Sequence, residues 1–347
     1  MNDETMMAVV KAEAALGFSY IEVARPRPGS GEVLVKVKAA SACGTDSLIY
    51  DWEPWAEGRV RPPRIVGHEF AGEVAALGDG VTGVDVGQRV SAESHFFCGT
   101  CPQCLAGSQE VCHNLRIMGV DTDGAFAEYI AVPAANIWLN HPDIPDQVAS
   151  LQEPFGNAVD TVLAEPVSGK RVLIAGAGPI GLMCAALARA FGAIKVIISD
   201  PNEYRLELAH RMGADIALNP KVSPITGPVL SATRGEGVDV FLSVSGNPKA
   251  LIDGLTLLAP GGRASLLGLY NKPAPIPLNE LVIFKKLRLY GITGRKVFAT
   301  WQTTSRLLSS HKIDLKPLIT HELRLDEFDK GFELMRAGRC GKTIFRP

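Results

Sequence analysis

Four of the seven cysteines lie close together, and their spacing is typical of a metal site. They share a polar loop with Gly99, Pro102 and Gly107, and they are Cys98, Cys101, Cys104 and Cys112. Four thiolates suit a closed tetrahedral Zn²⁺ site with no coordination position left for a substrate. We therefore predict a structural zinc lobe at about 93–115. An iron–sulfur cluster is an open alternative on spacing alone, whereas loose core thiols do not explain four cysteines in one polar loop.

A glycine turn carries the second chemical motif. It follows the apolar run 172–175, opens a helix that Gly192 closes, and consists of Gly176, Ala177, Gly178, Pro179, Ile180 and Gly181. In such a G-x-G-x-x-G turn the glycines allow a tight bend, the approach of a pyrophosphate and close packing of the helix on the sheet. The N–H groups at the helix start then face the phosphates, and a proline is tolerated in that first turn. Glycines in a tight strand-to-helix turn can be purely structural, but the strand before, the helix after and an acid at the expected distance together predict a dinucleotide site.

An acidic residue supports this interpretation. The second strand of the unit, 196–199, ends at Asp200, about twenty residues beyond the glycines, where a carboxylate hydrogen-bonds the ribose 2′-hydroxyl. This arrangement favours NAD over NADP. A transmembrane helix is excluded, because the uncharged stretch 172–188 is shorter than the ~20 residues of a span and is rich in glycine.

Composition narrows the function classes. The 347 residues are too many for one ordinary core and predict two domains. A net charge of −2 offers no electrostatic footprint for nucleic acid or an anionic membrane. The N-terminal stretch has acids and no apolar segment, so we expect no signal peptide and a cytoplasmic protein. An odd, clustered cysteine set then indicates metal ligation more than disulfides.

Hydrophobic periodicity divides the chain. The first ~150 residues alternate apolar and polar residues in short runs, which predicts an irregular β-rich domain. After Asp200, helical and strand patterns alternate, so we expect an α/β fold with a parallel sheet covered on both faces. The last ~50 residues contain two amphipathic helices and a strand at 342–345 that returns to the N-terminal domain. In the later helix, Phe328, Phe332 and Met335 form a core-facing stripe.

A second metal site is less evident from spacing. Cys43, His68, Glu69 and Glu153 offer one thiolate, one imidazole and carboxylates, and we place them at the ends of separate strands. Together such residues hold a catalytic Zn²⁺ with a position open for water or substrate. Spacing alone does not show this, because a lone cysteine and a His-Glu pair are more often ordinary residues.

The order of these motifs resembles the zinc-dependent medium-chain dehydrogenases along the whole chain. Four motifs carry the resemblance: Cys43-Gly-Thr-Asp, Gly67-His-Glu, the four-cysteine loop and the late glycine turn. The likeness is closer still to the branch that oxidises L-threonine, and it rests on the stretches 43–55, 93–95, 153–159, 200–206 and 320–321. The resemblance implies a GroES-like catalytic domain at 1–156 and 297–347, a Rossmann domain at 157–296, and a homotetramer.

The resemblance also implies roles for single residues. Cys43, His68 and Glu69 become catalytic zinc ligands, with Glu153 a ligand or a near neighbour, and Thr45 receives the substrate proton. The adenosine end of NAD is lined by Ile180, Asp200 and Arg205, and the nicotinamide end by Leu267, Gly268, Leu269, Ile292 and Thr293. Arg205 alone suits the 2′-phosphate of NADP, but Asp200 beside it repels that group.

The implied reaction is the zinc-dependent oxidation of a secondary alcohol, L-threonine to L-2-amino-3-oxobutanoate, with hydride transfer to NAD. Two positions depart from the pattern: Leu48 stands where the family's relay histidine lies, and Asp160 where the threonine enzymes have histidine. A water or His95 would complete the proton relay. A polyol or other secondary alcohol, such as sorbitol or butanediol, is the alternative substrate. A non-catalytic nucleotide-binding protein is the remote alternative.

Overall fold

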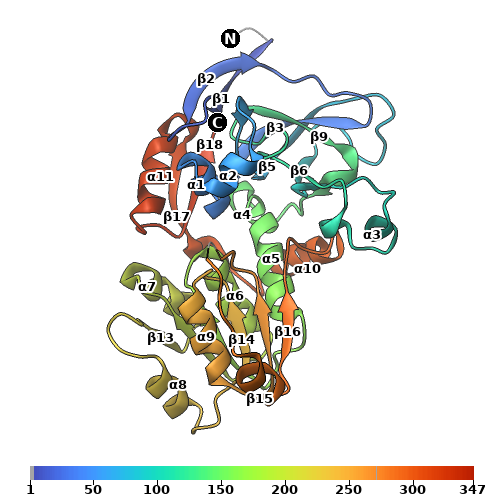
Figure 1. Cartoon of the computed structure of the whole chain (residues 1–347). Coiled ribbons are helices and arrows are strands. Elements are labelled where there is room, and N and C mark those ends of the chain that lie inside the picture. Colours follow the sequence, from blue (N-terminus) through green and yellow to red (C-terminus); the bar gives the residue numbers. More distant parts are fainter. Residues whose placement is uncertain (1–3, 271) are drawn as a thin grey trace. The chain divides into compact units, whose positions relative to one another are not determined.

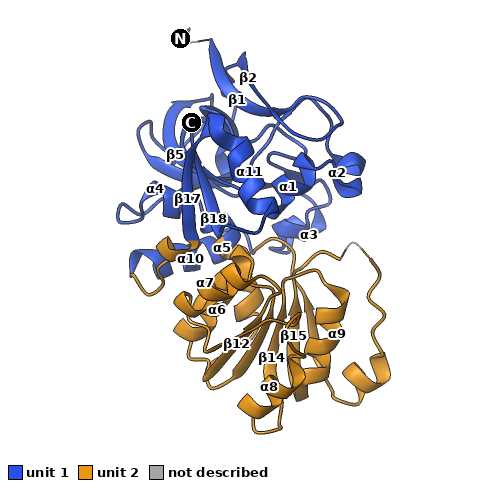
Figure 2. Cartoon of the chain, turned by 90° about the vertical axis from the view of Figure 1, so that its left-hand side faces the viewer, with its two compact units in different colours: residues 1–154, 296–310, 319–347 blue, residues 155–295, 311–318 orange. Residues whose placement is uncertain are grey.

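The computed structural model describes residues 4–270 and 272–347, and the chain forms two compact units. Unit 1 comprises 1–154, 296–310 and 319–347, and unit 2 comprises 155–295 and 311–318 (Figure 2). The domains implied by the resemblance, 1–156 with 297–347 and 157–296, stay a prediction. The segment 311–318 belongs to unit 2.

Unit 1 is β-rich, as the periodicity predicts. Its strands are β1 (Thr5–Lys11), β2 (Ser19–Ala24), β3 (Glu32–Ser41), β4 (Arg64–Ile65), β5 (Glu69–Leu77), β6 (Arg89–Ala92), β7 (His95–Phe96), β8 (Arg116–Ile117), β9 (Tyr129–Pro133), β10 (Ile137–Leu139), β17 (Ile319–Arg324) and β18 (Lys342–Arg346). Its helices are α1 (Gly44–Tyr50), α2 (Pro54–Arg59), α3 (Pro102–Leu105), α4 (Asp146–Ala149), α10 (Ala299–Ser309) and α11 (Phe328–Arg336). Figure 1 shows these elements around a curved sheet.

The main sheet of unit 1 contains the last strand of the chain, whereas β2, β1 and β4 form a separate sheet. Its strand order is β10-β6-β5-β3-β18-β17, with β9 also paired to β3. The C-terminal strand β18 therefore returns to the N-terminal domain, as predicted, and pairs antiparallel with β3 through Ile344 and Ser41. The expected stripe of α11 faces the core, because Phe328 and Phe332 are buried there and Met335 packs against it.

Unit 2 confirms the predicted parallel sheet. It contains β11 (Arg171–Ala175), β12 (Lys195–Ser199), β13 (Ile216–Leu218), β14 (Val238–Ser243), β15 (Leu258–Leu266) and β16 (Arg288–Gly291), with the helices α6 (Pro179–Ala190), α7 (Glu203–Arg211), α8 (Thr226–Ala232) and α9 (Pro248–Leu257). The strands run parallel in the order β13-β12-β11-β14-β15-β16. Figure 2 shows α6 and α7 on one side of the sheet and α9 on the other.

This strand order fixes where a ligand binds in unit 2. The order reverses between β11 and β14, which is the topological switch point of a doubly wound sheet. At such a point the loops after neighbouring strands part, and dinucleotides bind at the carboxyl ends of the strands. The helix α5 (Gln152–Leu163) carries the chain from unit 1 into unit 2.

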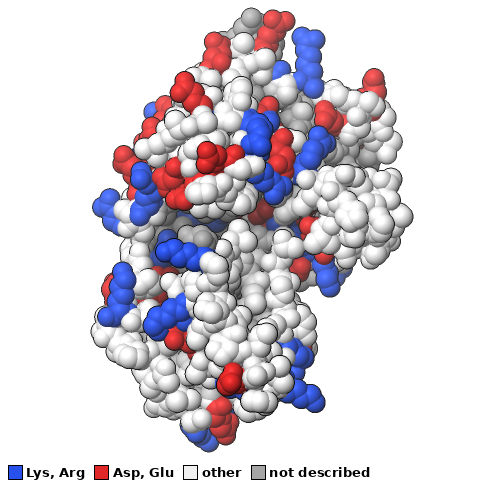
Figure 3. Space-filling view, in the orientation of Figure 1, with Lys and Arg blue, Asp and Glu red and all other residues white. Residues whose placement is uncertain are grey.

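Acidic and basic side chains are interspersed on the molecular surface that Figure 3 shows. Among the helices of residues 4–270 and 272–347, none combines the length and apolar composition needed to cross a bilayer.

Candidate metal and cofactor sites

The four cysteines of the loop converge on one point. Their Sγ atoms lie 3.5 Å apart for Cys101–Cys104, 3.8 Å for Cys101–Cys112 and 3.5 Å for Cys98–Cys112. A tetrahedron with Zn–S bonds of about 2.3 Å has S···S edges of about 3.8 Å, whereas a disulfide bond measures about 2.0 Å. An iron–sulfur cluster would place its thiolates on different irons, hence farther apart. The separations therefore fit a single zinc ion.

Backbone amides favour the thiolate form in this loop. The amide of Cys101 donates to Sγ of Cys98, and the amides of Cys98 and Asn114 donate to Sγ of Cys112. Hydrogen bonds from the Thr100 amide and hydroxyl, with that of the Cys101 amide, lower the pKa of Cys98 to about 5. Burial raises the pKa of Cys104 to about 12. A thiol of this kind must lose its proton when it binds a metal ion.

A second group of ligands forms where two antiparallel strands meet. Ser41 at the end of β3 pairs with Glu69 at the start of β5, so the residues just beyond β3 lie beside those just before β5. Cys43, at the N-cap of α1, thereby comes next to His68 and Glu69, and the three ligand atoms lie within 4.8 Å of one another. Among the described residues, this group of ligand atoms does not include Glu153. It stands in the first turn of α5, not at a strand end as the sequence suggested.

The atoms of this group fit a catalytic zinc. Glu69 is fully buried, and its Oε1 has no hydrogen-bond partner among the described residues. A buried carboxylate oxygen without a partner is costly unless it meets a cation. One thiolate, one imidazole and one carboxylate are three zinc ligands of the open, catalytic type. The two ligand groups confirm the prediction of one structural and one catalytic zinc.

An acidic residue outside the predicted ligands, Asp46, faces the ring of His68. Oδ1 of Asp46, a fully buried side chain, lies 3.3 Å from Nδ1 of His68. Burial lowers the pKa of His68, but Asp46 and Cys43 outweigh it and raise that pKa well above its usual value. Metal-binding histidines commonly give their second nitrogen to a carboxylate, which fixes the ring.

A short segment links Glu153 to His95. The hydroxyl of Ser94 donates to Oε1 of Glu153 at 2.7 Å. On the next residue, Nδ1 of His95 lies 2.9 Å from Oε1 of Glu93, whose other oxygen accepts a bond from the Trp301 indole at 2.7 Å. Glu93 therefore holds the His95 ring, and the roles expected for His95 and Glu153 stay predictions.

The glycine turn has the geometry that its sequence predicts. Gly176 adopts a φ of 109°, which disfavours other residues. The carboxylate of Asp200, at the end of β12, accepts the amide of Ala177 at 2.8 Å and that of Asn202 at 2.9 Å. Asp200 thus connects the glycine turn to the end of the neighbouring strand β12 by a hydrogen bond. Pro179 and Ile180 occupy the first turn of α6.

Two glycines of the turn make a matched test. A Cβ on Gly181 would lie 1.9 Å from the carbonyl oxygen of Gly176, whereas one on Gly178 would meet no atom within 4 Å. We expect Gly181→Ala to destabilise the protein by about 1–3 kcal/mol. Gly178→Ala should leave the melting temperature unchanged and raise the Kd for NADH about tenfold, because its methyl group takes up room meant for the pyrophosphate. Thermal melts and NADH fluorescence titrations measure both, and equal effects of the two variants on stability would contradict this assignment.

The remaining cofactor residues lie beyond the ends of neighbouring strands. Leu267 and Gly268 follow β15, and their amides both donate to the carbonyl of Ser243 at the end of β14. Ile292 and Thr293 follow β16, while Leu269 is 76% exposed. On α7, Nε of Arg205 is buried without a hydrogen-bond partner among the described residues. These three segments follow the carboxyl ends of β15, β16 and β12, the edge at which dinucleotides bind in such sheets.

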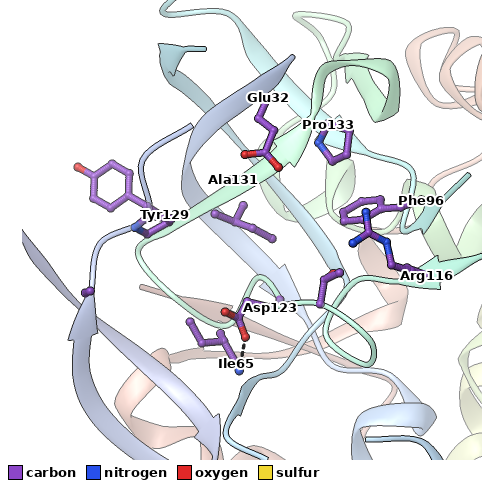
Figure 4. A pocket seen from close by; sticks show the side chains of 13 residues that line it. Glu32, Ile65, Phe96, Arg116, Asp123, Tyr129, Ala131 and Pro133 are labelled. Atoms are coloured by element: carbon purple, nitrogen blue, oxygen red, sulfur yellow. Dashed lines mark hydrogen bonds between the residues drawn. The ribbon is translucent and has the colours of Figure 1, made fainter. Parts of the chain in front are cut away.

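A cavity of unit 1 lies away from these residues. It has a volume of about 230 Å³ and is lined by Phe96, Arg116, Asp123 and Tyr129, among others (Figure 4). None of the predicted zinc or cofactor residues lines it. The candidate site is therefore defined by its ligand atoms and not by this cavity.

Three comparisons with known proteins agree with this geometry. Residues 29–145 match the model of the alcohol dehydrogenase GroES-like domain, and 179–310 match that of the zinc-binding dehydrogenases. L-threonine 3-dehydrogenase of Pyrococcus horikoshii is 54% identical over 99% of both chains, and that of Bacillus subtilis is 49% identical over 100% of both. An Escherichia coli CFT073 protein described as a short chain alcohol dehydrogenase, solved with NADH, superimposes with a TM-score of 0.91 at 31% identity, covering 99% of this chain and 100% of its own.

Proposed function

Since this chain belongs to the zinc-binding alcohol dehydrogenase family, we propose that it oxidises L-threonine at the hydroxyl-bearing carbon to L-2-amino-3-oxobutanoate, with NAD as hydride acceptor. The observation that carries the chemistry is the convergence of Cys43, His68 and Glu69. The identity over the full chain to L-threonine 3-dehydrogenases supports the substrate.

Different residues of the two units bind the metal, accept the proton and bind the cofactor in this reaction. Bound Zn²⁺ supplies Lewis acidity, which lowers the pKa of the substrate hydroxyl. Cys43, His68 and Glu69 would hold the metal, with Glu153 as a further ligand or a near neighbour. Thr45, half-buried in α1, takes the hydroxyl proton. In unit 2, the glycine turn binds the pyrophosphate and Asp200 binds the adenosine ribose.

The proton must leave Thr45 by a route other than residue 48, because Leu48 carries no titratable group. We assign this step to His95, whose ring Glu93 orients. His95→Gln should lower kcat about tenfold or more at pH 6, where proton release limits, and less at pH 9. Pre-steady-state and steady-state pH profiles measure this. A profile of wild-type shape would exclude His95 and leave a water in the relay.

A substrate panel tests the function. Zinc-loaded enzyme should form NADH from L-threonine with a kcat/KM at least tenfold above those for 2,3-butanediol and sorbitol at matched concentrations. Leu48 is the observation that favours the second candidate, a polyol or other secondary-alcohol dehydrogenase. Turnover of a polyol without turnover of threonine would overturn the substrate assignment and keep the chemistry.

Membership of this family also supports a proposal about the oligomeric state and the cellular location. We propose a homotetramer that acts on a small-molecule alcohol in the cytoplasm. Apolar side chains offer material for an interface: Leu278, Ile283 and Phe284 in unit 2 are 56%, 61% and 77% exposed. Light scattering during size-exclusion chromatography would return a mass near four times 37.0 kDa for a tetramer.

A further inference from the structure

A buried lysine contacts the catalytic zinc group from the far end of the sequence. The side chain of Lys342 is 2% exposed, and its Nζ forms an ion pair with Oε2 of Glu69, 273 residues away in the sequence. The same Nζ donates to the carbonyl of Ala42 at 2.9 Å, directly before Cys43. The sheet explains the contact, because β18 lies beside β3, and β3 beside β5. Lys342 thus touches one zinc ligand and the backbone next to another.

The two carboxylate oxygens of Glu69 differ in their hydrogen-bond partners. Oε2 accepts hydrogen bonds from both Lys342 and the hydroxyl of Ser41. Oε1 is buried and has no hydrogen-bond partner among the described residues. A carboxylate held in this way can offer a metal only one oxygen readily, because the other is already engaged by a cation and a hydroxyl.

The buried site carries an excess of negative charge, which the ammonium of Lys342 reduces. The thiolate of Cys43 and the buried carboxylates of Asp46, Glu69 and Glu153 carry four negative charges, of which a bound Zn²⁺ would offset two. The ammonium of Lys342 offsets a third. The Nζ of Lys342 has the partners of an ammonium, because it pairs with the Glu69 carboxylate and donates to the Ala42 carbonyl.

We propose that Lys342 is a positioning residue that restricts Glu69 to one zinc-facing oxygen and so keeps a coordination position open for the substrate. Without the ammonium, both oxygens of Glu69 would bind the metal. The zinc would then be held more tightly and would be less accessible to the alcohol. This inference rests on the proposed zinc chemistry and is independent of which alcohol is oxidised.

The test replaces the ammonium and follows the metal itself. In the full-length enzyme, Lys342→Met should slow release of the catalytic zinc to a chromogenic chelator about tenfold. With Co²⁺ in the catalytic site, its visible bands should weaken relative to wild type, because a second carboxylate oxygen raises the coordination number. Alcohol turnover should fall about 100-fold in kcat, and Lys342→Arg should restore part of it.

Two further variants keep the proposal falsifiable. Lys11→Met removes another fully buried lysine of unit 1, which donates to the carbonyls of Gly17 and Tyr50 and contacts no zinc ligand. It should leave zinc release and the Co²⁺ spectrum unchanged. If Lys342→Met does not fold, Ser41→Ala should shift both readouts in the same direction by a smaller amount. Zinc release at or above the wild-type rate in the folded variant would overturn the proposal, even if no tested alcohol is a substrate.

Discussion

Cys43→Ala is expected to reduce kcat/KM for alcohol oxidation by about 10³-fold or more and to leave one zinc per chain instead of two. The loss corresponds to about 4 kcal/mol of transition-state stabilisation, a magnitude that a bound Lewis acid supplies. Metal analysis by mass spectrometry and initial rates of NADH formation measure the two effects. The NADH affinity should not change, because the glycine turn belongs to unit 2.

The matched control lies in the cysteine loop. Cys101→Ser should also leave one zinc per chain, but should act through stability, since a closed four-thiolate site has no position for a substrate. We expect a lower melting temperature and retained turnover per folded, zinc-bearing catalytic site. If Cys43→Ala kept both zinc ions, or lost turnover no more than the Cys101 variant, the catalytic assignment of Cys43 would be wrong.

Asp200→Ala should produce the second large effect, on cofactor binding. The variant loses the acceptor for the ribose hydroxyl and also the bond to the Ala177 amide that fastens the turn. Hydrogen bonds to a charged group contribute about 1.5–3 kcal/mol each, so the Kd for NADH should rise about 10- to 100-fold. The preference for NAD over NADP should shrink, because the negative charge that repels a 2′-phosphate is gone. Fluorescence titrations with both reduced cofactors measure these changes.

Asp215, directly before β13, provides a control at the opposite end of β12. Its carboxylate accepts the amide of Val196 at 2.7 Å at the start of β12 and pairs with Arg189, so Asp215→Ala removes a similar bond away from the glycine turn. This variant should lose stability and keep its NADH affinity. Equal losses of NADH affinity in the two variants would show that Asp200 acts only through the stability of the sheet.

Local patterns predicted the parts of the site that are local in the chain. The glycine turn, Asp200 and the four cysteines depend on spacings within one supersecondary unit or loop, so their types and positions suffice. The parallel sheet of unit 2 followed from alternating helices and strands in the same way. The family resemblance then identified Cys43, His68 and Glu69 as one group.

Long-range pairing accounts for what the sequence did not reveal. Lys342 reaches Glu69 only because the last strand pairs with β3, and no local pattern marks that lysine as special. Trp301 likewise donates to Glu93, although the two residues are 208 positions apart in the sequence. Asp46 was the exception, since it belongs to the Cys43-Gly-Thr-Asp motif. Its position three residues after the N-cap, where its carboxylate accepts the Cys43 amide at 2.9 Å, was a readable signal.

The most direct test of the proposed reaction uses L-threonine deuterated at C3. Because hydride leaves this carbon for NAD, NADH formed by the zinc-loaded enzyme should gain one mass unit, and single-turnover rates should fall relative to unlabelled threonine. Threonine turnover without transfer of deuterium to NADH would contradict hydride transfer from C3.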